Sequence, residues 1–222
     1  MYHYMRHLLS YISSMKSIKI ISILMVILVF ASCKTMPKES QEQSIQADLR
    51  SDSEKLMEHF EPHDGMMSLL ADAKTGDILA SADLPETGVD RTSTYLYEPG
   101  PVFDVFFDSA RRHLPESMRD SDNALHYMIS QFGFTEYPLV TARQMVKAAT
   151  VFANHGMMDD IEVISPKVAD ITLKSMDRER PADIDEYVMV KHKDANAVSA
   201  LAFYPAEDPQ YILYVVVLQP AK

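Results

Sequence analysis

Residues 67–84, MSLLADAKTGDILASADL, determine how the rest of the chain is interpreted. Two mainly apolar runs, 66–72 and 77–82, flank the segment Ala-Lys-Thr-Gly at 73–76. A glycine at the end of such a segment allows the positive φ that a tight turn needs. Short apolar runs on both sides of a turn are typical of a β-hairpin. The folded part of the chain is therefore expected to open with two antiparallel strands.

Three further strands are expected near the end of the chain. They are runs rich in β-branched and aromatic residues at 186–190, 197–204 and 211–218. The last two runs are separated by PAEDP at 205–209, which is typical of a hairpin loop. The early hairpin and the late strands are expected to share one antiparallel sheet that helices cover.

Helices are expected between the two groups of strands. The clearest is 141–154, where Thr141 is suited to cap the start and His155-Gly156 to end the helix. Apolar periodicity predicts further helices at 102–113, 123–132, 167–176 and, before the hairpin, 47–60. Strands, then helices, then strands indicate an α+β domain, with an antiparallel sheet flanked by helices.

The first 33 residues have the pattern of an export signal that ends at a cysteine. Three basic residues precede the apolar run 20–31, and the first acidic residue is Glu39. A run of about twelve residues suits a signal peptide and falls short of the roughly twenty that cross a bilayer. Small residues directly before Cys33 resemble the lipobox of bacterial lipoproteins, in which the cysteine is lipidated and the chain is cut before it. The alternative is a short transmembrane anchor with an incidental cysteine.

Cys33 is the only cysteine, so no internal disulfide is expected. The predicted organisation is a signal peptide at 1–32, a lipidated tether with a short helix at 33–61, and a folded domain at 62–222. The mature chain would be exported and held by lipid on the periplasmic or cell-surface face of a bacterial membrane, since two or more acyl chains suffice for stable anchoring.

The expected mature chain is strongly acidic. Removal of 1–32 removes three basic residues and no acidic one, which leaves 18 Lys and Arg against 32 Asp and Glu, a net charge of −14. Such acidity argues against a nucleic-acid partner. No nucleotide-binding glycine motif is present, and no cofactor is expected. His59 and His63 have a metal-like spacing, but Pro62 disfavours a shared helix and no third ligand is evident, so no metal site is expected.

Four segments resemble, in order, the transpeptidase domain of penicillin-binding proteins, especially class B. They are the hairpin 67–84, YEPGPVFD at 97–104, ARQMVKAATVFANHG at 142–156, and ALAFYPAEDPQYILYVVVL at 200–218. The resemblance implies a truncated form of the fold that this family shares with serine β-lactamases. It also implies a place in the cell envelope and acyl transfer through an activated serine.

The catalytic motif of the family is altered in this chain. In Ser-x-x-Lys, the lysine one helical turn later takes the proton of the serine. Pro101 stands at the serine position and has no hydroxyl, while Asp104 stands at the lysine position and reverses the charge. The resemblance therefore implies the frame of the enzyme without its nucleophile.

Two further motifs supply candidate binding residues. Ser121-Asp122-Asn123 stands where the family has Ser-x-Asn, which makes Ser121 and Asn123 candidates; the alternative is a helix cap. Lys191 begins a segment in place of Lys-Thr-Gly, but the threonine and glycine are missing, and the alternative is a solvated strand end. Without the glycine, a substrate backbone is less able to approach this strand closely.

These observations predict a non-catalytic lipoprotein of the cell envelope that resembles a penicillin-binding protein and binds a peptidoglycan stem peptide or an envelope protein. The enzymatic alternative is residual transpeptidase or peptidase activity, with water activated by Asp104. A third reading, an α+β lipoprotein unrelated to this family, is tested by whether the Pro101 helix, Ser121 and the strand near Lys191 lie together.

Overall fold

The structure is a computed structural model of the chain and describes residues 38–58, 63–179, 186–193 and 197–218. Cys33, His59 and the predicted signal peptide lie outside the described residues. Within the described ranges, no helix combines the length and apolar character needed to cross a membrane.

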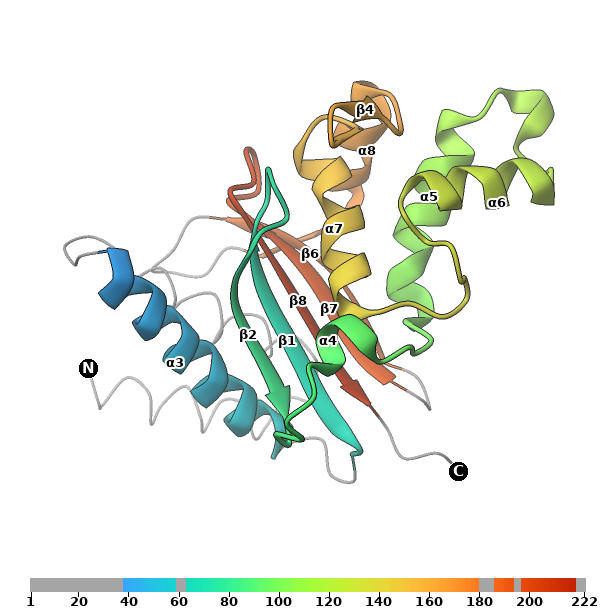
Figure 1. Cartoon of the computed structure of the whole chain (residues 1–222). Helices are drawn as coiled ribbons and strands as arrows, with labels where there is room; N and C mark the ends of the chain where they lie inside the picture. The colour runs from blue at the N-terminus through green and yellow to red at the C-terminus, as the bar shows by residue number, and fades with distance from the viewer. Residues whose placement is uncertain (1–37, 59–62, 180–185, 194–196, 219–222) are drawn as a thin grey trace.

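One antiparallel sheet of six strands forms the centre of the molecule (Figure 1). The predicted hairpin is β1 (Gly65–Asp72) and β2 (Ile78–Leu84), and the three late strands are β6 (Tyr187–Lys193), β7 (Ala197–Tyr204) and β8 (Tyr211–Leu218). The strand order is β2-β1-β8-β7-β6-β5, so β8 lies between the early hairpin and the late strands. The predicted α+β class with a shared antiparallel sheet is confirmed. The short edge strand β5 (Asp177–Glu179) was not predicted.

Helices cover both faces of the sheet. The turn η1 (Gly100–Phe103) leads into α5 (Asp104–His113), and α6 (Asp122–Gln131), α7 (Ala142–Ala153) and α8 (Pro166–Ser175) follow on the same side. The opposite side carries α3 (Lys38–Met57) against β1 and β2 (Figure 1). Four smaller elements complete the fold: α4 (Arg91–Thr94), η2 (Glu116–Met118), β3 (Met157–Met158) and β4 (Ile161–Glu162).

Local signals explain why α7 was predictable. Thr141 and Gln144 form a reciprocal capping box, because the Gln144 N–H donates to Thr141 Oγ1 at 3.2 Å and the Thr141 N–H donates to Gln144 Oε1 at 2.8 Å. Beyond the helix end, Gly156 has a φ of +92°, and a Cβ there would lie 1.9 Å from the Ile164 carbonyl oxygen. Only glycine fits this close turn.

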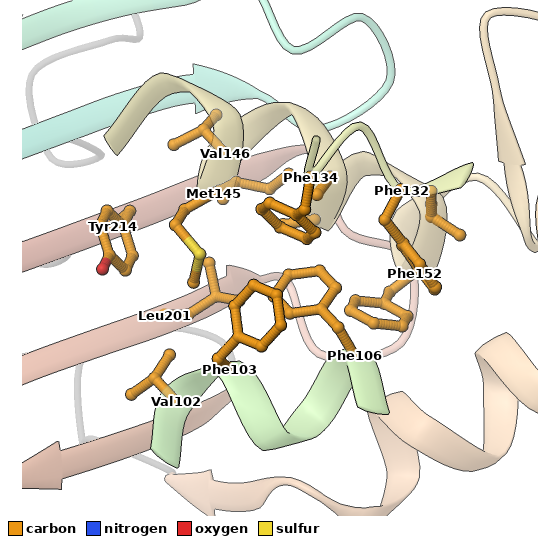
Figure 2. Close-up of a cluster of buried hydrophobic side chains, with 14 of the residues drawn as sticks. Val102, Phe103, Phe106, Phe132, Phe134, Met145, Val146, Phe152, Leu201 and Tyr214 are labelled. Carbon is orange, nitrogen blue, oxygen red and sulfur yellow. The ribbon is translucent and has the colours of Figure 1, made fainter. Parts of the chain in front are cut away.

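The alternation of side chains along each strand divides the core into two parts. On the α5–α8 side, Phe103, Phe106, Phe134 and Phe152 pack with strand residues such as Leu201 (Figure 2). The other part of the core contains Leu49 of α3 and the remaining strand side chains, including Tyr187, Met189, Ala200 and Val215.

The predicted tether and short helix need correction. The helix α3 begins at Lys38 rather than 47, and it is attached to the sheet rather than separate from a domain that starts at 62. The Gln46 amide donates to the Ser81 carbonyl and accepts from the Ser81 N–H at 2.9 Å, so it extends the backbone pairing of β2. Further along, Ser53 donates to Ser68 Oγ of β1 at 2.9 Å. Residues 38–46, which were expected to be part of a tether, therefore belong to α3.

Candidate functional site

Pro101, at the motif position where the family has its serine, is exposed in η1, and η1 contacts β6 and β7 and leads into α5. Ser199 of β7 is buried and donates to the Pro99 carbonyl oxygen at 3.1 Å, which fixes the turn in front of Pro101. Gly100 takes a φ of +65° in that turn, and proline is well suited to the first turn of a helix. The turn that carries Pro101 is thus held by a hydrogen bond to β7 and by the following helix.

A buried tyrosine pair holds the other end of this turn. The Tyr97 hydroxyl donates to the Tyr214 hydroxyl of β8 at 2.7 Å. Burial raises the pKa of both phenols well above the ordinary value, so both remain neutral. The Tyr97 backbone also forms an isolated antiparallel bridge with Val140, directly before α7. The turn is therefore connected to β8, β7 and the start of α7.

Asp104, at the position of the family lysine, is exposed at the start of α5. A carboxylate is favourable at a helix N-terminus, where a lysine would not be. Nearby, the Tyr137 ring stacks on Phe103 with a centroid distance of 5.0 Å. Partial burial raises the pKa of the Tyr137 phenol, and the negative charges of Asp104 and Glu98 raise it further. The site is therefore aromatic and acidic.

The hydroxyls on neighbouring elements serve the structure. Ser109 of α5 donates to the Val105 carbonyl oxygen at 2.6 Å and shares a 2.8 Å hydrogen bond with Thr172 of α8 in the buried core. Ser199 is engaged with Pro99, as described above. Neither hydroxyl has a lysine as its hydrogen-bond partner, so neither is activated in the way that Ser-x-x-Lys chemistry requires.

Ser121 caps α6, which was the alternative interpretation of the Ser-Asp-Asn motif. Its hydroxyl accepts from the Ala124 N–H at 3.4 Å, and its backbone bonds Met118 and Leu125. Among the described hydrogen bonds, none joins Ser121 or Asn123 to Pro101. The structure gives Ser121 a local role, and binding by Ser121 and Asn123 stays a prediction.

Lys191 lies on the opposite face of the sheet from the Pro101 turn. It is in phase with Tyr187 and Met189, which belong to the core on the α3 side, and it pairs with Ala200 of the same core. Its Nζ is 3.6 Å from Glu179 Oε1 of β5. Although η1 contacts β6, the structure does not bring the Lys191 side chain to the site.

Two residues of the site were not identified from the sequence. Glu98 is adjacent to the turn, whereas Tyr137 is 36 positions after Pro101 and reaches it only through packing of the loop between α6 and α7. The loop 132–141 is rich in aromatic and apolar residues, so its composition did not distinguish Tyr137 from its neighbours. Among the described residues, no group of three or more His, Cys, Asp or Glu side chains is arranged to hold a metal ion.

Comparison with solved structures supports the fold resemblance, whereas no family model and no curated protein sequence matches the chain. The transpeptidase domain of a D,D-transpeptidase from Legionella pneumophila aligns with a TM-score of 0.60 at 16% identity, over 76% of this chain and 83% of that one. Penicillin-binding protein 2X from Streptococcus thermophilus aligns with a TM-score of 0.63 at 15% sequence identity, over 77% of this chain and 47% of that one. The transpeptidase domain of penicillin-binding protein 3 from Burkholderia pseudomallei aligns with a TM-score of 0.59 at 13% sequence identity, over 82% of this chain and 87% of that one. The chain has the fold of a penicillin-binding transpeptidase domain, as its sequence motifs predicted.

Proposed function

We propose that this chain is a non-catalytic lipoprotein of the cell envelope that binds through the surface where its fold relatives carry a nucleophile. The observation that carries the proposal is Pro101. It occupies the nucleophile position of the sequence motif, has no hydroxyl, and sits in a turn fixed by the Ser199–Pro99 hydrogen bond. The ligand is a peptidoglycan stem peptide or an envelope protein.

Retention of the frame favours binding over simple decay of an enzyme. The Tyr97–Tyr214 and Ser199–Pro99 hydrogen bonds both hold the turn that presents Pro101. Phe103 and Phe106 anchor the following helical residues in an aromatic core (Figure 2). A rigid element at the surface suits recognition, because little conformational freedom is lost on binding.

The first test is labelling by a fluorescent penicillin. The purified chain is incubated with the compound, denatured and separated by electrophoresis, beside an active penicillin-binding protein as a positive control. We expect no covalent label on this chain, because acylation requires a nucleophile that Pro101 cannot supply. A label that survives denaturation and competes with unlabelled penicillin would contradict the non-catalytic proposal.

The lipid anchor is tested separately. Growth with an alkyne fatty acid and mass spectrometry of the mature N-terminus should find acyl chains on Cys33, and Cys33→Ser should abolish both the acylation and the cleavage before residue 33. Recovery of Cys33→Ser in the membrane fraction with an intact N-terminus would favour the alternative, a short transmembrane anchor.

An enzymatic role would rely on Asp104, which is exposed at the site and could activate water. Hydrolysis or transfer on purified stem peptides that is lost in Asp104→Asn would support that role. Absence of turnover in both forms, together with measurable peptide binding, would support the non-catalytic proposal.

A further inference from the structure

Exposed apolar side chains gather around the bridge between Tyr97 and Val140. Two backbone hydrogen bonds of 3.0 Å, one in each direction between these residues, hold their segments side by side. Eight large apolar side chains are exposed among the described residues, and four of these, each 37% to 43% exposed, flank the bridge: Tyr95, Leu96, Tyr137 and Leu139. Several exposed apolar side chains on two adjacent segments are typical of an interaction site.

The backbone geometry places a carboxylate within this apolar surface. The Tyr97 side chain points into the core, so its neighbours Leu96 and Glu98 point outward in an extended segment. In an antiparallel pair centred on Tyr97 and Val140, Glu98 lies opposite Leu139. Leu96, Glu98 and Leu139 therefore share one outward face.

Tyr137 joins this face to Asp104. Its ring is fixed by stacking on Phe103 and by an edge contact with Phe107 at 5.1 Å. Phe103 directly precedes Asp104 in the chain, and the negative charges of Asp104 and Glu98 raise the pKa of the Tyr137 phenol. The surface thus combines a fixed aromatic ring, two leucines and two acidic side chains.

This combination selects the charge of a ligand. The negative charges of Asp104 and Glu98, which act on the Tyr137 phenol, attract an ammonium or guanidinium group through Coulomb interactions. They disfavour a ligand that presents a free carboxylate here, as the end of a stem peptide does. The leucines on either side require apolar partners, and protein interfaces commonly combine such contacts with arginine.

We propose that one surface of this protein binds a basic segment of a partner protein in which Lys or Arg alternate with apolar residues. This surface, here called the Tyr137 surface, consists of Leu96, Glu98, Asp104, Tyr137 and Leu139. The inference rests on the proposed function, because it assigns a partner to the same non-catalytic surface. It selects an envelope protein over a stem peptide. The acidic charge of the whole mature chain, −14, also favours encounter with a basic segment.

The probe is a short fluorescent peptide of alternating lysine and leucine, with lysine–serine and glutamate–leucine peptides as matched controls. Fluorescence anisotropy should show saturable binding of the lysine–leucine peptide and weaker binding of both controls. In the double variant Glu98→Lys/Asp104→Lys, the Kd should rise by about tenfold or more, since like charges then face each other. The matched control is Asp120→Lys/Glu162→Lys, which makes the same change in net charge at two exposed positions outside the surface. It should leave the Kd within about twofold of wild type.

A second pair of variants keeps the acidic charges. Tyr137→Ala and Leu139→Ser should each weaken binding of the lysine–leucine peptide, whereas Tyr127→Ala, an exposed tyrosine of α6, should not. Circular dichroism confirms folding, and Glu98→Gln/Asp104→Asn serves if the lysine variant does not fold. Equal losses in the surface and control variants, or no saturable binding, would overturn the inference.

The experiment separates this inference from the proposed function. One possible result is that the protein binds a stem peptide but not the lysine–leucine peptide, and that the Tyr137-surface variants lose the stem-peptide binding. This result would overturn the proposal of a basic partner and would be consistent with the non-catalytic function. Covalent penicillin labelling would instead overturn the proposed function, whatever the peptides do.

Discussion

The Tyr97 hydroxyl donates a 2.7 Å hydrogen bond to the Tyr214 hydroxyl, and the pair connects the turn before Pro101 to β8. Both side chains are buried. Removal of one hydroxyl leaves the other buried without its hydrogen-bond partner. Tyr97→Phe should therefore lower the free energy of unfolding by about 1–3 kcal/mol. Tyr97→Phe/Tyr214→Phe should lose less than the sum of the two single variants, because no hydroxyl is left unpaired. Urea denaturation of all four forms checks this, and additive losses would contradict the coupling.

The Ser199–Pro99 hydrogen bond should govern the rigidity of the turn that presents Pro101. Ser199→Ala leaves the Pro99 carbonyl without its partner and should cost about 1–3 kcal/mol of unfolding free energy. Amide hydrogen exchange at Gly100 and at residues 102–104 should become faster than in wild type. Ser130→Ala, on the exposed side of α6, is the matched control and should change neither quantity. Unchanged exchange in Ser199→Ala would show that packing alone holds the turn.

Asp52 of α3 should make stability depend on pH in the acidic range. Burial raises the pKa of its carboxyl above the ordinary 3.8, while Lys55 at 3.1 Å partly offsets that effect, and Oδ2 has no hydrogen-bond partner. The folded state therefore holds this proton more tightly than the unfolded state. Stability from Asp52 is fully present below pH 3.8 and is lost as pH rises through the raised folded-state pKa.

Asp52→Asn should remove this dependence. Between pH 3 and pH 7, the unfolding free energy of Asp52→Asn should rise relative to that of wild type, as measured by urea denaturation at each pH. Glu54→Gln changes an exposed carboxyl of the same helix and serves as the control. A difference between Asp52→Asn and wild type that stays constant with pH would contradict the prediction.

Restoring the two altered motif residues should not restore acylation. Pro101→Ser/Asp104→Lys supplies the serine and lysine, but Ser121 remains the cap of α6 and Lys191 remains on the α3 side of the sheet. Catalytic groups that act as a unit give little rate enhancement when only some of them are in place. We expect no fluorescent penicillin label on the folded double variant. Robust labelling would show that the nucleophile pair was the only missing part.

The sequence predicted elements whose determinants are local. Thr141 and Gln144 mark the start of α7 within four residues, and the apolar strands β7 and β8 stand on either side of an evident loop. The polar helix α3 was placed too late because few of its side chains are apolar. Its attachment depends on Gln46 and Ser53, whose partners Ser81 and Ser68 lie elsewhere in the chain.

The candidate site was harder to predict because it depends on pairing and packing. The positions of Pro101 and Asp104 follow from a motif within eight residues. The face on which Lys191 lies depends on the phase of β6 against β7, and a shift of one residue reverses it. Tyr137 reaches Phe103 only through the path of a loop, and no local pattern encodes that contact.

With a lipid anchor at Cys33, the early start of α3 would keep the domain close to the membrane. If Cys33 carries lipid as proposed, only residues 34–37 separate the anchor from the first helical residue, Lys38. Four extended residues span at most about 14 Å. Hydrogen bonds attach α3 to β1 and β2, so the sheet would also stay close to the membrane. The protein could then contact only partners close to the bilayer surface. A partner would have to present its basic segment at that height.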